Sequence, residues 1–142
     1  NLTTLTQMYL LASDYETALA PALEVAEMSE SGDGYDTYGY LHYVMRNYQE
    51  AADAFQMAID KGNLTNRADT LLFLARALIE LDDFEGAIDA ATQSADAGGE
   101  SERRSATDYI TFIESTESRF NIIAERRQDA IDFYEPYPSL ID

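Results

Sequence analysis

The side chain best suited to acid-base chemistry is His42, the single histidine of a chain that contains no cysteine. A metal site or a proton relay would need a second histidine or a thiolate beside it. His42 also lies on the apolar stripe of a predicted helix, so we expect a packed or partly buried side chain rather than a ligand or base. A Ser-His-Asp system is not indicated either. We therefore predict a non-enzymatic protein without catalytic, metal-binding or cofactor-binding residues.

Two glycine-containing segments could in principle bind ions. SGDGYD at 31–36 has acidic residues near glycine, but an EF-hand calcium loop needs ligands at positions 1, 3 and 5 and a glutamate at position 12, and this segment lacks that order. Gly98 and Gly99 have no accompanying lysine or G-x-G-x-x-G pattern that would suit a phosphate. We interpret the first as a turn between helices and the second as a helix stop.

The charge of the chain limits its partners. It has 27 acidic and 9 basic residues, a net charge of −18. Such a field repels nucleic-acid phosphates and anionic lipid headgroups and favours basic partners, although solubility alone is an alternative explanation. No apolar stretch approaches the ~18 residues of a membrane span. We expect neither nucleic-acid binding nor membrane insertion.

Three similar phrases organise the chain: SDYETALAPALEVAE at 13–27, RNYQEAADAFQMAIDK at 46–61 and DDFEGAIDAATQSAD at 82–96. Aligned on Ala18, Ala51 and Ala87, they recur after 33 and 36 residues. In each phrase an aromatic residue lies three positions before the alanine, and small or apolar residues follow at helical spacing. A second helical stripe lies upstream of each phrase, separated from it by a short polar turn. Fixed periods of this length indicate stacked helical hairpins.

These phrases resemble the tetratricopeptide repeat (TPR). The middle copy has Tyr48, Ala51, Phe55 and Ala58 at the four positions that define the second helix of that repeat. Small residues occupy the expected slot of the first helices: Thr6, Gly39 and Ala75. The resemblance implies an all-α superhelix of three antiparallel hairpins, at about 1–30, 34–63 and 67–99, followed by a C-terminal helical segment at 101–134 within one domain spanning residues 1–134.

A narrower resemblance rests on AIDKGNL at 58–64 and ATDYITFIES at 106–115. Both segments are similar to the C-terminal half of TPR proteins associated with TonB and ExbB/ExbD in marine Gram-negative bacteria, where tryptophan is common at the position of Tyr109. This resemblance implies a periplasmic scaffold that assists TonB-dependent outer-membrane transport. The alternative is a TPR assembly or regulatory module with an unrelated partner, self-associating through its C-terminal helix.

The resemblance also implies a concave groove lined by the first helix of each hairpin. The positions that would line it are Gln7, Leu10, Asp36, Tyr40, Tyr43, Leu72, Arg76 and Ile79. Tyr40 and Tyr43 beside acidic residues suit a protein or extended peptide that is proline-rich or basic, because flat aromatic rings accept polyproline surfaces and carboxylates pair with cations. The alternative is that these tyrosines only pack between neighbouring hairpins.

The C-terminal segment has apolar residues at helical spacing from 106 to 134, which predicts one long helix or two helices with a break near 115–118. Its first half should cover the third repeat, since a terminal repeat needs a capping helix. The second half either folds back or contacts another chain, and a homodimer is one such contact. The residues concerned are Phe120, Ile123, Ile131 and Tyr134. The tail at 135–142 is expected to be irregular because of its two prolines.

Overall fold

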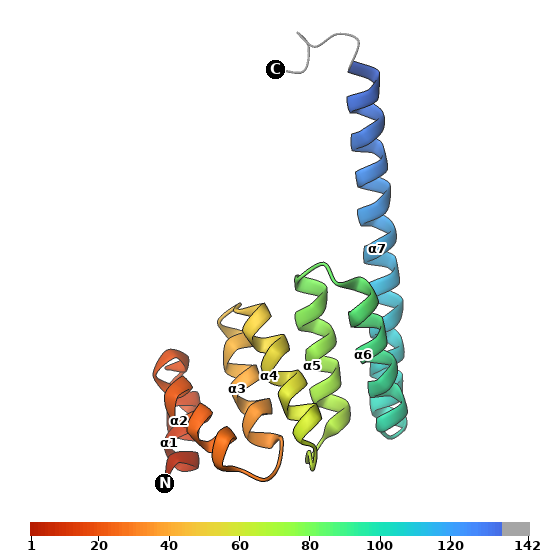
Figure 1. Cartoon of the computed structure of the whole chain (residues 1–142). Coiled ribbons are helices and arrows are strands. Elements are labelled where there is room, and N and C mark those ends of the chain that lie inside the picture. The colour runs from red at the N-terminus through yellow and green to blue at the C-terminus, as the bar shows by residue number, and fades with distance from the viewer. Residues whose placement is uncertain (135–142) are drawn as a thin grey trace.

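The computed structural model describes residues 1–134, and these form seven α-helices with no β-strand among them. The helices are α1 (Leu2–Leu11), α2 (Tyr15–Met28), α3 (Asp33–Val44), α4 (Tyr48–Lys61), α5 (Arg67–Glu80), α6 (Phe84–Ala97) and α7 (Glu100–Tyr134). Six of them make three antiparallel pairs, and α7 covers the last pair (Figure 1). The predicted all-α architecture is confirmed. The predicted irregular tail lies outside the described residues.

One turn geometry closes all three pairs. In each turn the residue two positions before the second helix has a positive φ, and the next amide donates to a carbonyl in the last turn of the first helix. The residues with positive φ are Ser13 (57°), Arg46 (64°) and Asp82 (60°). The bonds run from Asp14 N to Tyr9 O (2.9 Å), from Asn47 N to His42 O (2.9 Å) and from Asp83 N to Leu78 O (3.0 Å). The short polar connections in the sequence are therefore tight, identical chain reversals.

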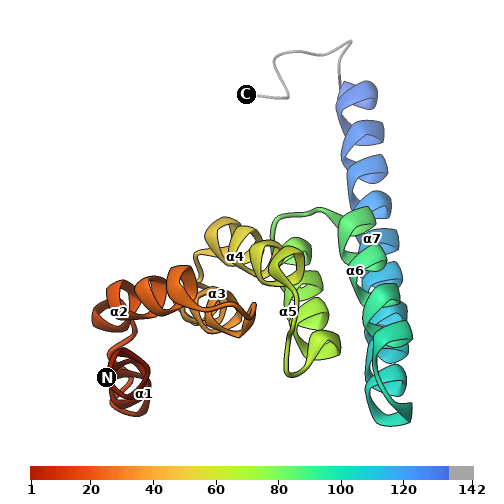
Figure 2. The same cartoon turned by 60° about the horizontal axis from the view of Figure 1, so that its bottom comes forward.

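The stack of helix pairs is curved, and α3 and α5, the first helices of the middle and third pairs, lie on its inner side. Helix α3 contacts α5, and α5 contacts α7, whereas within residues 1–134 no contact of comparable extent joins α2 to α4 or α4 to α6. Elements that approach one another across successive pairs lie on the inner side of a curved stack. The pairs follow one another in chain order from α1 to α7 in both views (Figures 1 and 2). Helices α3, α5 and the first half of α7 thus form the inner layer.

The larger of two core clusters fills the space between the middle pair, the third pair and α7. Phe55 is completely buried at its centre, and its ring stacks on Phe73 of α5 with 5.8 Å between ring centroids. Ala51 and Ala87, two of the alanines that define the repeat, belong to the same cluster and have no exposed surface. The repeat pattern therefore predicted packing residues.

Glycines of the inner layer allow close helix packing. A Cβ on Gly34 would lie 2.6 Å from the Cα of Ala26 in α2, and one on Gly39 would lie 2.9 Å from the ring of Phe55. Gly32 also approaches the end of α4, where its amide donates to Gly62 O at 2.7 Å. The glycines of SGDGYD thus let α3 pack against its neighbours, in addition to forming the expected turn.

Helix α7 is continuous over 35 residues. The serines and threonines that suggested a break at 115–118 do not interrupt it, because such hydroxyls can donate to the carbonyl four residues earlier, as Thr116 does to Phe112 O at 2.9 Å. In its first half Ala106 and Ile113 are fully buried. The residues from 118 to 133 are all exposed, and this half projects beyond the stack instead of folding back (Figures 1 and 2).

No helix within residues 1–134 combines the length and the apolar character needed to cross a bilayer.

Candidate protein-binding groove

Aromatic rings from three helices meet on the inner layer. We call this group of residues the aromatic patch; it consists of Tyr40 and Tyr43 of α3, Phe73 and Arg76 of α5, and Tyr109 of α7. The rings of Tyr40 and Tyr43 each form a T-shaped pair with the ring of Phe73, with centroid separations of 5.7 and 5.6 Å. Edge-to-face contacts of this kind stabilise aromatic pairs by about 0.5–1.5 kcal/mol. The patch therefore joins the middle pair, the third pair and α7 into one surface.

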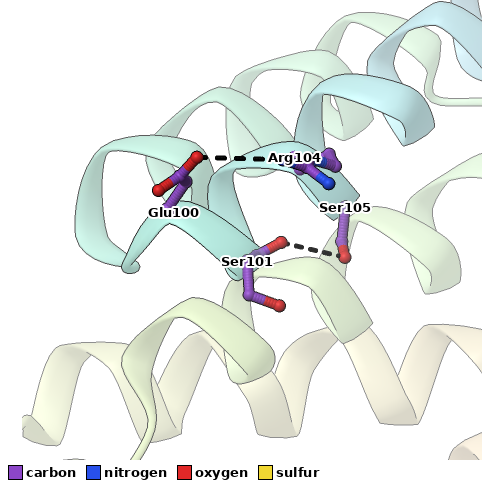
Figure 3. Close-up of polar contacts among 4 residues, drawn as sticks. All are labelled: Glu100, Ser101, Arg104 and Ser105. Carbon is purple, nitrogen blue, oxygen red and sulfur yellow. Dashed lines mark hydrogen bonds and ion pairs between the residues drawn. The ribbon is translucent and has the colours of Figure 1, made fainter.

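Arg76 lies between two of these rings. Its guanidinium carbon is 5.2 Å from the centroid of Phe73 and 5.7 Å from that of Tyr109. Among residues 1–134 it forms no salt bridge, unlike Arg104, which lies 3.7 Å from Glu100 on the outer face of α7 (Figure 3). Cation–π contacts hold the guanidinium in place without using its hydrogen-bond donors. Within residues 1–134 the donors of Arg76 therefore remain free for a ligand.

Burial affects the two patch tyrosines nearest to Arg76. It raises the pKa of Tyr109 to about 12, against a smaller opposing effect of the Arg76 charge. The pKa of Tyr43 is raised for the same reason, again opposed by Arg76. Both hydroxyls stay protonated in the physiological range. They act as neutral hydrogen-bonding groups beside the charged Arg76 guanidinium.

A hollow of about 290 Å³ lies beside Arg76. It is bounded by Asp69, Leu72, Phe73, Arg76 and Ser94 together with Ser101, Glu102 and Ser105 of α7. Ser105 donates its hydroxyl to Ser101 O at 3.1 Å within the first turns of α7 (Figure 3). The hollow contains two carboxylates and one guanidinium, so its charge is net negative.

Two aspartates in the first turns of α3 have pKa values shifted in opposite directions. Asp36 is half-buried and accepts a hydrogen bond from the Thr70 hydroxyl at 2.8 Å; burial raises its pKa, and the charges of Asp33 and Asp69 add to this rise. Burial alone would also raise the pKa of Asp33, but hydrogen bonds from Thr65 and Ser31 outweigh it and lower the pKa. Asp33 accepts from the Thr65 amide and hydroxyl, each at 2.8 Å. The inner layer is thus acidic at this end.

The eight predicted groove residues fall into two places. Tyr40, Tyr43 and Arg76 belong to the aromatic patch. Leu72 beside them is 8% exposed, Ile79 packs against the larger core cluster, and Asp36 bonds to Thr70. The other two, Gln7 and Leu10, line a separate hollow of about 140 Å³ between the first pair and α3. The residues therefore do not form one uninterrupted surface.

Sequence reasoning did not assign Phe73 and Tyr109 to the groove. Phe73 corresponds in the repeat to Thr4 and Thr37, whose short side chains cannot reach the next helix. An aromatic residue in place of two threonines was the available signal. Tyr109 was assigned to the apolar stripe of the C-terminal helix, and its position opposite α5 depends on how that helix packs.

His42 is buried, as expected. Its ring forms a T-shaped pair with that of Tyr38, with the ring centroids 4.6 Å apart, and its Nδ1 is 3.4 Å from Asn47 Nδ2. Nε2 has no hydrogen-bond partner among the described residues, and burial lowers the pKa of the ring against the opposing charge of Glu50. The histidine is therefore neutral near pH 7. In residues 1–134 no group of three or more His, Cys, Asp or Glu side chains is placed to hold a metal ion.

Comparison with known proteins identifies the fold. PcrH, in complex with the chaperone binding region of PopD, superposes with a TM-score of 0.72 over 82% of this chain and 90% of its own, at 14% identity. A T3SS complex from Aeromonas hydrophila superposes with a TM-score of 0.73 over 82% of this chain and 81% of the other, at 15% identity. MamA gives 0.69 over 97% of this chain and 74% of its own, at 19% identity. The fold is that of TPR-like helical repeat proteins.

At these identities the likeness concerns the fold alone. No family model matches the sequence, and no curated protein matches it. The predicted repeat architecture is nevertheless confirmed over most of the chain, including three hairpins and a long capping helix.

Proposed function

We propose that the chain is a non-enzymatic scaffold that binds an extended segment of another protein across the aromatic patch. The observation that carries this proposal is the convergence of four rings and the unpaired Arg76 from three helices on the inner layer. A surface of flat rings with few charges at its centre and acids around it suits a backbone that presents proline rings and cations. PcrH, of the same fold, was solved with a segment of PopD, which supports a partner of this kind.

The partner's composition follows from the charges around the patch. Asp69 and Glu102 line the adjoining hollow, and Asp36 bonds to Thr70 of α5, against the one guanidinium of Arg76. A segment that alternates proline with lysine would meet both features, and salt should weaken its binding. A segment in which glutamate replaces lysine would meet net repulsion.

We further propose that the partner belongs to a TonB system and that the protein acts in the periplasm, as an accessory of TonB-dependent outer-membrane transport. The support is the resemblance of AIDKGNL and ATDYITFIES to TonB-associated TPR proteins, together with the chemistry of the patch. The periplasmic regions of TonB proteins are rich in proline and carry many lysines and glutamates; their proline and lysine residues are the ones that fit an acidic surface lined with tyrosine.

A peptide titration tests the groove. A Lys-Pro repeat peptide should bind and a Glu-Pro peptide of equal length should not. Tyr40→Ala should weaken the binding by roughly 5- to 30-fold, because it removes an aromatic contact of about 1–2 kcal/mol. Met57→Ala is the matched control, since Met57 is an apolar side chain of α4 and is 47% exposed against 39% for Tyr40. Equal binding of both peptides, or unchanged affinity of a folded Tyr40→Ala variant, would disprove the groove.

A cellular experiment tests the identity of the partner separately. The protein should be recovered from the periplasmic fraction of its native host, and cross-linking there should capture a TonB-system component in the wild type but less of it with Tyr40→Ala. If the Lys-Pro peptide binds but the captured protein is unrelated to TonB, the groove stands and the alternative of an assembly module with another partner is correct.

A further inference from the structure

One apolar face runs along the whole of α7. Its first half packs against α6, and its second half continues beyond that contact. Over its first half, α7 packs antiparallel to α6 through Ala106 and Ile113. The contact ends where Phe84, the first residue of α6, meets Phe120 with ring centroids 5.8 Å apart. Helix α7 has 35 residues and α6 has 14. At ~1.5 Å per residue, the 14 residues of α7 after Phe120 therefore run roughly 20 Å past the end of its partner.

The apolar stripe does not stop at that point. Beyond Phe120 the same face carries a shallow hollow of about 390 Å³. Its lining is Phe120, Ile123, Ala124, Arg127, Gln128 and Ile131. These residues recur at spacings of three and four, so they share one side of the helix. Ile123 is 67% exposed and Ile131 is 44% exposed.

The charge of this half differs from that of the repeats. Residues 118–134 carry three arginines and three acids, a net charge of zero: Arg119, Arg126 and Arg127 against Glu125, Asp129 and Asp132. Residues 1–100 carry 4 basic and 18 acidic residues, a net charge of −14. Association of two copies is therefore not opposed electrostatically at this half of α7, whereas the repeats repel one another.

We propose that this face pairs with the same face of a second copy of the chain, with the two α7 helices antiparallel. An antiparallel second helix runs in the direction of α6 and lies mostly beyond Phe84, with its last turn beside the first turn of α6. Its C-terminal end then meets the N-terminal end of α6, where opposite ends of the helix dipoles attract. The two acidic repeat stacks lie at opposite ends of the pair, whereas a parallel pair would bring them side by side.

The stripe also fixes a register for the pair. When residue 125 of one copy lies opposite residue 126 of the other, Phe120 lies opposite Ile131 of the second copy. The same register places the small Ala124 opposite the long Arg127 of the second copy, so the hollow over Ala124 receives the arginine stem. Because two half-helices form a modest interface, we expect a dissociation constant in the micromolar range.

Sedimentation equilibrium of the full chain, at concentrations up to about 100 µM, tests the pairing. It compares the wild type with variants at two adjacent isoleucines. The wild type should approach twice the monomer mass of 15.9 kDa. Ile123→Glu should raise the dissociation constant at least about tenfold, because it places a charge in the apolar contact. Ile122→Glu is the control, as Ile122 points about 200° around the helix from Phe120 and should leave association unchanged. A wild type that stays monomeric at all concentrations overturns the proposal, as does equal disruption by both variants.

Disulfide trapping tests the direction of pairing, since the chain has no cysteine of its own. Chains with Phe120→Cys mixed with chains with Ile131→Cys should form the mixed disulfide, with little bonding between like chains. These positions are 11 residues, roughly 16 Å, apart along the helix, so only an antiparallel pair brings them together. Exclusive bonding between like chains would overturn the antiparallel arrangement.

Discussion

The first helix pair and the two pairs that follow it share a repeat pattern but differ in packing. In α1 only Thr6 is buried, whereas α5 buries seven residues. The buried cluster at the first pair consists of Ala18 and Ala22 of α2 with Leu41 of α3. Pro21 lies inside α2 without an amide hydrogen to donate. The larger cluster, at the later pairs and α7, contains ten buried residues, Phe55 among them. A shared pattern thus fixes the geometry of a repeat without fixing its stability, which depends on neighbours on both sides.

The largest effect should come from the position that differs most between these regions. Phe55→Ala removes the ring at the centre of the larger cluster and should lower the free energy of unfolding by about 3–5 kcal/mol. Ala22 occupies the same repeat position in the first pair, and Ala22→Gly should cost only about 1–2 kcal/mol. Urea denaturation followed by circular dichroism measures both. Similar losses in the two variants would show that the pairs are equally stabilised.

The junction between the two regions should be the next most sensitive. Gly34→Ala places a methyl group against the backbone of Ala26, which should cost about 1–3 kcal/mol and loosen the first pair from α3. Hydrogen exchange should accelerate in α1 and α2 while α5 and α6 keep their protection. In the control Gly99→Ala the new Cβ would meet only the flexible Glu102 carboxylate at 3.1 Å. Uniform acceleration along the chain would contradict a local weak junction.

A smaller loss of stability should follow from removing a hydrogen bond of the third pair that has no counterpart in the first pair. Ser94 is buried in α6 and donates to Ala68 O of α5 at 2.6 Å, whereas no side-chain hydrogen bond joins α1 to α2 in the described part of the chain. Ser94→Ala should lower the free energy of unfolding by about 1 kcal/mol. Thr92→Ala, on the exposed side of α6, should leave it unchanged. A Ser94→Ala variant as stable as the wild type would show that this bond adds nothing to the stability of the third pair.

The smallest effect concerns the pH dependence of the acids in α3. Because the folded pKa of Asp36 is raised, its ionisation destabilises the folded state as pH rises above the unfolded value of about 3.9. Asp36→Asn should therefore be more stable than the wild type near pH 7, and the gain should fade as pH falls toward about 4. Asp33 has a lowered pKa, so Asp33→Asn should be less stable near pH 7, with a loss that also fades in acid. Denaturation series at several pH values measure both, and a gain for Asp33→Asn would contradict the role of its Thr65 bonds.

The sequence predicted the features of the fold that depend on local periodicity. The alanines at 18, 51 and 87 and the polar turns were sufficient for three hairpins, because close helix packing requires small residues at fixed positions. The sequence did not show whether α7 folds back after Phe120, since that depends on where α6 ends in space. Three of the five residues of the aromatic patch, Tyr40, Tyr43 and Arg76, were among the groove positions predicted from the repeat. Phe73 was missed because its reach toward α3 follows from side-chain length and not from its position in the repeat.

The identical turns of the three hairpins also bear on how the chain reaches its structure. Each brings together helices that are adjacent in sequence, and the additional contacts, between α3 and α5 and between α5 and α7, skip only one helix. Little loop entropy is lost before favourable contacts form, so folding should be fast for a chain of this length. The middle and third pairs, with the larger core, are the natural place for folding to begin, and the first pair can join them afterwards. During synthesis, α1 and α2 would emerge before the α3 surface that they need for packing.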